Sequence, residues 1–341
     1  MQKISLSLYR SNIIRGLAIL AVVLLHVLAY PHGIYNGDKQ LLFISLDQLS
    51  RFCVPAFLII SGYGLATKYG NEKINYFEFI KKRIGKLFPL YLLWSFASIL
   101  IVKSVPAWSF DNQPISLITQ LLLGQADYQL YFLPVLFQLY FLFPLLWLFR
   151  KKPNLLMISA LLLQIALYVF YAARADNSER FEYVISLSWI GYFVFGIYLK
   201  LQELPKILIK SALPLSFIAA ISVIAFSLRQ INSGIDPLFA LKFTKLAVIP
   251  FGFLINLSLI TMILPTRNFF TGLVSKILAW LGENSFLIFL SHTVGLRIIY
   301  AISMKQLDPG TLMGTILMWI ITIYLSLKIL NEKKTKAVIP Q

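Results

Sequence analysis

The sequence lacks the residues from which proteins build covalent or metal frameworks. Its 341 residues include one cysteine, Cys53, and three histidines. A single cysteine excludes a disulfide framework within the chain and a zinc site of several thiolates. The sequence also has no phosphate-binding loop, no zinc-binding spacing and no Ser, His and Asp in an order typical of hydrolases. We therefore predict no metal site and no metal cofactor.

Charged residues are also scarce, and acidic ones most of all. They make up 13% of the chain, with 14 Asp and Glu against 31 Lys and Arg, so the formal net charge is +17. Such a surplus is typical of nucleic-acid-binding proteins, but it also marks the cytoplasmic loops of membrane proteins. The hydrophobic share is 58% and the mean hydropathy is +0.76, whereas globular domains have about 45–50% apolar residues. We therefore expect a membrane bilayer around the protein and no nucleic acid partner.

Apolar runs of membrane-spanning length recur along the whole chain. A helical run of about 20 residues crosses a hydrocarbon core about 30 Å thick. We predict an all-α polytopic membrane protein that forms one domain over residues 1–341, with no appended soluble domain and no cleaved signal peptide. The predicted spans are 12–32, 41–66, 87–104, 115–149, 154–173, 181–199, 207–228, 238–263, 277–303 and 311–330. The fourth is too long for one crossing, so we expect 115–124 to be an interfacial or re-entrant piece beside a cavity and 130–149 to cross.

The distribution of basic residues predicts that both termini are cytoplasmic. With ten spans and both ends inside, the inner segments hold twenty Lys and Arg side chains. The outer loops hold six, namely Lys39, Lys103, Arg174, Arg180, Arg229 and Lys305. Because positively charged residues collect in cytoplasmic loops, this difference favours the orientation. No internal repeat is evident, which argues against an inverted-repeat transporter.

The first predicted span keeps two ionisable residues, Arg15 and His26, in the stretch "SNIIRGLAILAVVLLHVLAY". They are eleven positions apart, so at about 100° and 1.5 Å per residue they share one helix face, roughly 16 Å apart along the axis. Ionisable groups inside a membrane are functional by default, and we take both as candidate catalytic residues. His26 can serve as a general base or as a covalent carrier of an acyl group. Snorkelling of Arg15 to lipid headgroups and a structural role for His26 stay open.

A basic cluster precedes the third predicted span. Lys82, Arg83 and Lys86 lie within about one turn of helix. Their cations can bind the phosphate oxygens of a cytoplasmic ligand such as coenzyme A. The same cluster is also ordinary for a cytoplasmic loop, so both interpretations stay open.

Further ionisable residues lie inside other predicted spans. Asp47 and Arg51 are four residues apart in the second span, so they can form an ion pair on one helix face. Glu283 and His292 belong to the ninth span, in the stretch "LGENSFLIFLSHTVGLR". We take these four as candidate substrate-binding residues, while a purely structural role stays open for each. In addition, Gly62 in the second span permits close packing of another helix.

Five sequence elements together resemble those of the integral-membrane acyltransferase 3 family. In chain order they are "RGLAILAVVLLH", "VPAFLIISGY", "RIGKLFPLY", "LYFLPVLFQLY" and "GENSFLIFLSH". Each is weak alone, but the five occur in the family's order and at similar spacing over nearly the whole chain. One departure is Lys86, which stands where the family's basic motif has a second arginine. The charge is retained there, and the planar bidentate fork is lost.

The resemblance implies a core of ten membrane helices in a bacterial plasma membrane. The implied reaction transfers an acyl group, usually acetyl and in some relatives succinyl, from cytoplasmic acyl-CoA to a sugar hydroxyl of a cell-surface glycan or a lipid-linked saccharide. In this interpretation the donor is bound by the basic set Arg83, Lys86 and Lys82. Arg15 holds its phosphate or thioester end, and His26 lies where the acyl carbon and the hydroxyl meet. The alternative is a polysaccharide exporter, a label that some relatives have carried.

Overall fold

Helices make up almost the whole protein, which confirms the predicted all-α class. The computed structural model describes residues 1–29, 39–70, 72, 74–104, 117–173, 179–262, 269–303 and 312–334. Within these residues the strand content is one antiparallel pair, β1 (Gln2–Lys3) and β2 (Glu203–Leu204), in which Gln2 lies opposite Leu204. This pair ties the N-terminus to a connection between two helices of the second half.

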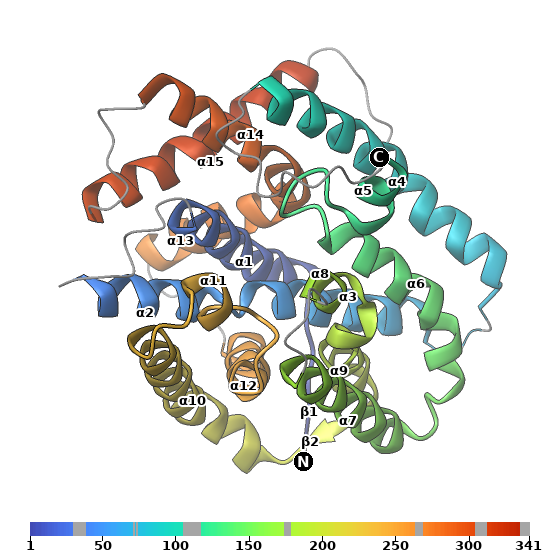
Figure 1. Ribbon diagram of the computed structural model, residues 1–341. Coiled ribbons are helices and arrows are strands. Elements are labelled where there is room, and N and C mark those ends of the chain that lie inside the picture. The colour runs from blue at the N-terminus through green and yellow to red at the C-terminus, as the bar shows by residue number, and fades with distance from the viewer. Residues whose placement is uncertain are drawn as a thin grey trace.

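The helices occupy all ten of the predicted spans. In chain order they are α1 (Leu8–Leu28), α2 (Gln40–Ser50), α3 (Cys53–Tyr69), α4 (Tyr76–Ser104), α5 (Leu117–Leu123), α6 (Phe132–Leu148), α7 (Pro153–Ala172), α8 (Glu179–Val184), the 3-10 helix η2 (Ser186–Trp189), α9 (Ile190–Leu201), α10 (Lys206–Asn232), α11 (Pro237–Ala240), α12 (Val248–Thr261), α13 (Phe269–Glu283), α14 (Ser285–Ser303) and α15 (Leu312–Lys334). Figure 1 shows α1 near the middle of the molecule, with α13, α14 and α15 to one side.

Several of these helices have the length and composition of membrane spans. Five stretches qualify, namely Leu8–Leu28, Gln40–Tyr69, Tyr76–Ile101, Pro153–Ala172 and Lys206–Asn232. A sixth candidate, Gly272–Glu283 followed by Ser285–Ile299, is bent by 78° at its break. The multi-pass character is therefore supported, whereas ten crossings and cytoplasmic termini stay predictions. Some predicted features lie outside the described residues, among them 30–32 and 115–116 of the spans and the cations Lys73, Arg174, Arg267, Lys305 and Lys336.

Breaks interrupt several of the predicted spans, and two of them bear on the candidate site. The predicted break in the fourth segment is confirmed, because residues 124–131 form turns between α5 and α6. Gly124 has a φ of 67°, and a Cβ there would meet the backbone of Tyr131, so glycine is required. A second break, absent from the sequence-based prediction, lies at Asn284 between α13 and α14. Its side-chain amide donates to the Trp280 carbonyl oxygen at 2.9 Å, a local bond that competes with continuation of the helix.

Two pairs of helices pack with their backbones in contact at glycines. α1 meets α13 at Gly16 and Gly282, where an added Cβ would collide with the backbone of the partner helix. α3 meets α9 in the same way at Gly62 and Gly196. Small residues permit this close approach, which maximises dispersion contacts between helices in lipid. The predicted packing role of Gly62 is thus confirmed.

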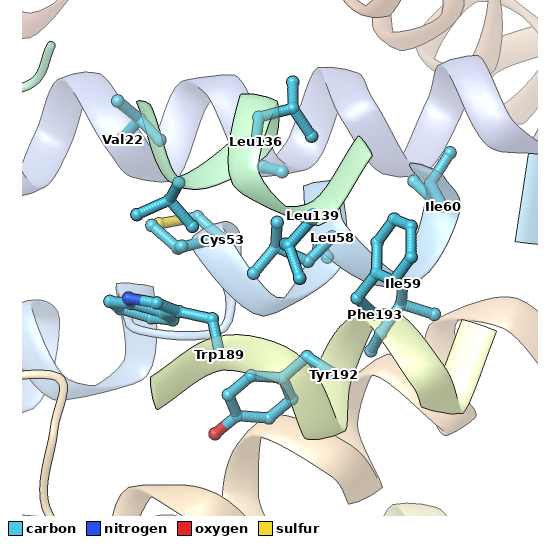
Figure 2. Close-up of a cluster of buried hydrophobic side chains, with 14 of the residues drawn as sticks. Val22, Cys53, Leu58, Ile59, Ile60, Leu136, Leu139, Trp189, Tyr192 and Phe193 are labelled. Carbon is cyan, nitrogen blue, oxygen red and sulfur yellow. The ribbon is translucent and has the colours of Figure 1, made fainter. Parts of the chain in front are cut away.

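The largest hydrophobic core lies between α1, α3, α6 and α9. Figure 2 shows Val22 of α1, Cys53 of α3 and Leu136 of α6 in one cluster of buried side chains. Trp189 and Phe193 join the same cluster from η2 and α9. These contacts fix the neighbours of α1, the helix that carries both candidate catalytic residues.

A smaller core cluster marks one end of the molecule. It joins α1, α2, α10 and the segment after α11 through Leu28, Phe43, Ile231 and Leu241. α1 and α10 both begin close to the strand pair in sequence, and both end in this cluster. The cluster and the strand pair therefore lie at opposite ends, which we call the His26 end and the strand end.

Candidate active site

His26 is bonded directly to a second histidine. It lies near the C-terminal end of α1 and is half-buried. Its Nδ1 atom is 2.6 Å from Nε2 of His292, and the two imidazole planes differ by only 16°. This geometry suits an N–H···N hydrogen bond in the plane of both rings. Two residues that the sequence analysis assigned separately, one to catalysis and one to substrate binding, therefore form a single unit.

The hydrogen bonds of His292 determine which nitrogen of His26 is free. His292 is fully buried in α14, and its Nδ1 lies 3.0 Å from the carbonyl oxygen of Ile288. A carbonyl oxygen only accepts, so this Nδ1 carries a proton, and Nε2 of the neutral ring has the lone pair. His26 then donates from its Nδ1, which leaves its own Nε2 with an unshared lone pair. A general base or a nucleophile needs that lone pair.

A loop between α5 and α6 covers one side of His26. The ring of Tyr128 meets the imidazole edge-on, with the centroids 4.7 Å apart and the planes at 70°. The sequence analysis missed this residue. The signal was the stretch "GQADYQ", which places polar groups at the break of an otherwise apolar segment. The tyrosine ring limits access to His26 from this side.

Two polar contacts hold this loop against α14. Arg297 donates to Asp127 at 2.7 Å, and both side chains are buried. Gln129 donates to Thr293 at 2.8 Å. Because α14 also carries His292, one helix positions both the histidine partner and the loop.

The predicted ion pair of Asp47 and Arg51 is present at the break between α2 and α3. Arg51 makes two hydrogen bonds to the carboxylate, at 2.8 Å from Nε and 3.0 Å from Nη2. The guanidinium also lies 4.4 Å from the centre of the Phe243 ring, a cation–π contact. Gln48, next to Asp47, donates to the carbonyl oxygen of Leu241 at 3.3 Å, and Leu241 packs in the cluster at the His26 end. The structure thus brings this pair to the His26 end of α1.

Arg15 lies nearer the strand end and has weaker contacts. Its Nη1 is 3.4 Å from Oδ1 of Asn12, whose own Nδ2 donates to the Glu283 carboxylate at 3.3 Å. Arg15 is half-buried and Glu283 is exposed. The structure therefore places Glu283 with Arg15 and apart from His292, because α13 and α14 diverge by 78° just after Glu283.

The basic cluster lies on an exposed part of α4. Lys82 forms an ion pair with Glu78 at 2.5 Å, and both side chains are exposed. Arg83 is half-buried and Lys86 is exposed, and neither has an ion-pair or hydrogen-bond partner among the described residues. α4 starts at the strand end, because α3 ends there, with the hydroxyl of Tyr63 bonded to the N-terminal segment.

Comparison with known protein families supports the resemblance of the sequence elements. The family model described as an acyltransferase domain, that of the acyltransferase 3 family, matches residues 8–330. The chain belongs to the acyltransferase 3 family. No curated protein and no solved structure is found to match it. Family membership and the apolar helices together make the protein a multi-pass membrane acyltransferase.

In this acyltransferase, the face of α1 shared by Arg15 and His26 is turned to the protein interior. Ala18 and Val22 lie on that face between them and are 0% and 5% exposed. Val22 packs in the hydrophobic cluster with Cys53 (Figure 2). A hydrophobic layer therefore separates the two candidate catalytic residues.

The His26 end of this acyltransferase offers acid–base or nucleophilic chemistry. Among the residues that the structure describes, no three His, Cys, Asp or Glu side chains lie close enough together to hold a metal ion. The reactive group of this site is the unprotonated Nε2 of His26, whose lone pair is not used in the bond to His292.

Proposed function

We propose that this acyltransferase transfers an acyl group from acyl-CoA to a hydroxyl group of a cell-surface glycan or a lipid-linked saccharide. Acetyl is the expected group, with succinyl as the alternative. The observation that carries the proposal is the hydrogen bond between His26 and His292, which leaves the lone pair of His26 Nε2 available in a half-buried site. The proposal places the protein in a bacterial plasma membrane with the donor on the cytoplasmic side.

In the direct route, His26 acts as a general base. Its Nε2 removes the proton from the acceptor hydroxyl while the hydroxyl oxygen attacks the thioester carbonyl. The new C–O bond forms, the C–S bond breaks, and the proton passes from His26 to the departing CoA sulfur.

In the second route, His26 carries the acyl group. Its Nε2 attacks the thioester carbonyl, the C–S bond breaks and the CoA thiolate leaves. The acceptor hydroxyl oxygen then attacks the acyl carbon, the C–N bond to the ring breaks, and the hydroxyl proton goes to the CoA thiolate. Both routes need the same unprotonated Nε2. His292 is therefore a positioning residue in either route, because its hydrogen bond selects the tautomer of His26.

The donor, in this proposal, binds at the strand end. Arg83 and Lys86 have no anionic partner within the described residues, so their charges are available to phosphate oxygens. Lysine at position 86 contributes charge without the bidentate geometry of arginine. Arg15 holds a phosphate of the donor, because the thioester has to reach His26 about 16 Å further along α1. Glu283 positions Arg15 through the hydrogen bonds of Asn12.

The alternative function is polysaccharide export. The 78° bend between α13 and α14 favours it, because broken membrane helices are frequent in transporters. The histidine pair favours transfer, since export by itself requires no base with a selected tautomer.

A deletion strain separates the two functions. Under the transfer proposal, surface glycan still appears outside the cell but lacks its ester. Under export, the glycan stays inside. We would measure the amount and the acyl content of surface glycan after returning either the wild-type chain or His26→Ala. An ester fully restored by His26→Ala would remove the proposed role of His26.

A further inference from the structure

A second buried charged pair involves a carboxylate whose bonding is incomplete. Glu182 of α8 is 1% exposed, and one of its oxygens lies 3.1 Å from Nζ of Lys242. The other oxygen, Oε1, is buried and has no hydrogen-bond partner among the described residues. A buried acceptor without a donor is unfavourable, so this atom points to a ligand that carries a hydroxyl or N–H group. Lys242 is half-buried and can reach the same ligand.

Several aromatic rings contact one another next to this pair in the chain. Tyr183 directly follows Glu182, and its ring centre is 5.7 Å from that of Tyr131. The Tyr131 ring lies 6.3 Å from Trp189, and the Trp189 ring lies 5.8 Å from Phe243. Tyr131 and Phe243 are half-buried, so each residue keeps some accessible surface.

The aromatic group is continuous with the candidate active site. Phe243 packs against the guanidinium of Arg51, and Leu241, next to Lys242, packs with Leu28 of α1 in the small cluster at the His26 end. Lys242 directly precedes Phe243 in the chain. A ligand held by Glu182 and Lys242 would therefore lie on the Arg51 side of His26.

We propose that Glu182, Lys242 and these aromatic rings form a subsite for a neutral pyranose ring of the acceptor, an inference that rests on the proposed acyl transfer. The incompletely bonded carboxylate oxygen accepts from a sugar hydroxyl, and the lysine ammonium donates to a sugar oxygen. The rings contact the apolar C–H faces of the sugar, as in ligand sites with aromatic walls and a few placed polar groups. Because the carboxylate and the ammonium neutralise each other, the subsite favours an uncharged polyol over an ion.

Lys245, three residues after Lys242, provides a matched control. It is 6% exposed, and its ammonium donates to Ser227 at 2.7 Å, to Gln48 at 3.4 Å and to the carbonyl oxygen of Ala240. These acceptors all belong to the protein, so this lysine has a structural role.

The test measures acceptor kinetics of the purified full-length protein, with acetyl-CoA as donor and methyl glucoside, methyl galactoside and methyl N-acetylglucosaminide as acceptors. Glu182→Gln keeps the shape of the side chain, and Lys242→Met removes the ammonium. We expect each to raise the KM for the pyranosides about tenfold or more, as for the loss of a hydrogen bond to a charged group. The KM for acetyl-CoA should not change, nor should transfer to cyclohexanol, an alcohol without the other hydroxyls. Lys245→Met should lower thermal stability and leave the pyranoside KM unchanged.

Three results would overturn the subsite. They are an unchanged pyranoside KM in Glu182→Gln, an equal rise in Lys245→Met, or a wild-type protein that acylates no pyranoside yet restores the glycan ester in a deletion strain. Glu182→Gln is isosteric, so a folding failure of Lys242→Met leaves the test intact. A wild-type protein that neither acylates a pyranoside nor restores the glycan ester would instead refute acyl transfer itself. Failure of the subsite can therefore be told apart from failure of the proposed acyl transfer.

Discussion

The two ends of α1 hold their candidate residues in different ways. At the His26 end, the imidazole bonds to His292 at 2.6 Å and packs against Tyr128. At the strand end, Arg15 has a longer contact of 3.4 Å to Asn12. Proton transfer and nucleophilic attack need a geometry fixed to within about 0.5 Å, whereas Coulomb attraction between cations and phosphates falls only slowly with distance. Under the proposed function, the end with the shorter contacts would carry the chemistry and the end with the longer contacts would bind the donor.

Replacing His26 with alanine should have the largest effect, because both proposed routes need its Nε2. We expect kcat to fall by about 10²–10⁴-fold, the usual contribution of a general base. Binding of acyl-CoA, which depends on the strand end, should stay close to wild type. Release of CoA measures the first quantity, calorimetric titration measures the second, and a single symmetric peak on size exclusion controls for folding. A fully active variant would mean that the His26 end does not carry the chemistry.

Removing the hydrogen bond of His292 should come next. In His292→Leu, His26 loses the partner that selects its tautomer, so kcat should fall by roughly ten- to a hundredfold, or about 1.4–2.8 kcal/mol. Leucine suits the position because the side chain is fully buried. His292→Asn keeps an oxygen that can accept from His26, so it should recover part of the rate and keep the wild-type pH–rate profile. An equal loss in both variants would reduce His292 to a packing residue.

Local features of the site could be predicted from the sequence. Arg15 and His26 share an inward face because the helical period alone sets the relative direction of two residues on one helix. Asp47 and Arg51 pair because positions four apart are neighbours on a helix surface. Gly62 marked a close helix contact because only glycine leaves room for a second backbone.

Contacts between distant segments could not be predicted in this way. His26 and His292 are 266 positions apart, and periodicity says neither which helices are neighbours nor how they are aligned along their axes. The bend at Asn284 also separates Glu283 from His292. The polar stretch from Glu283 to Ser285 after Gly282 was a signal of this break, but it gives neither the angle nor the direction of a bend. Glu182 went unnoticed because it stands at the edge of a predicted span, where a carboxylate is ordinary.

Packing at the strand end can be tested at Gly16, next to Arg15. Gly16→Ala places a methyl group against the backbone of α13, and overpacking of this kind costs about 1–3 kcal/mol. Gly64→Ala is the matched control, because a Cβ there meets nothing within 4 Å and alanine stabilises a helix interior by roughly 0.5–1 kcal/mol. Thermal unfolding temperatures in detergent should therefore move in opposite directions. Similar shifts in both variants would show that α1 can move away from α13, and that packing does not fix Arg15.

The smallest effects should come from the basic cluster. Exposed charges contribute about 0–1 kcal/mol each, so Arg83→Ala should raise the KM for acyl-CoA only up to about fivefold and leave kcat unchanged. Lys82→Ala should do less, because Glu78 already pairs with this lysine. The Debye length falls from about 10 Å at 0.1 M salt to about 3 Å at 1 M, so the wild-type KM should rise with salt, and rise less steeply in Arg83→Ala. A KM that does not respond to salt would mean that fixed hydrogen bonds hold the donor, and the strand end would then be as ordered in function as the His26 end.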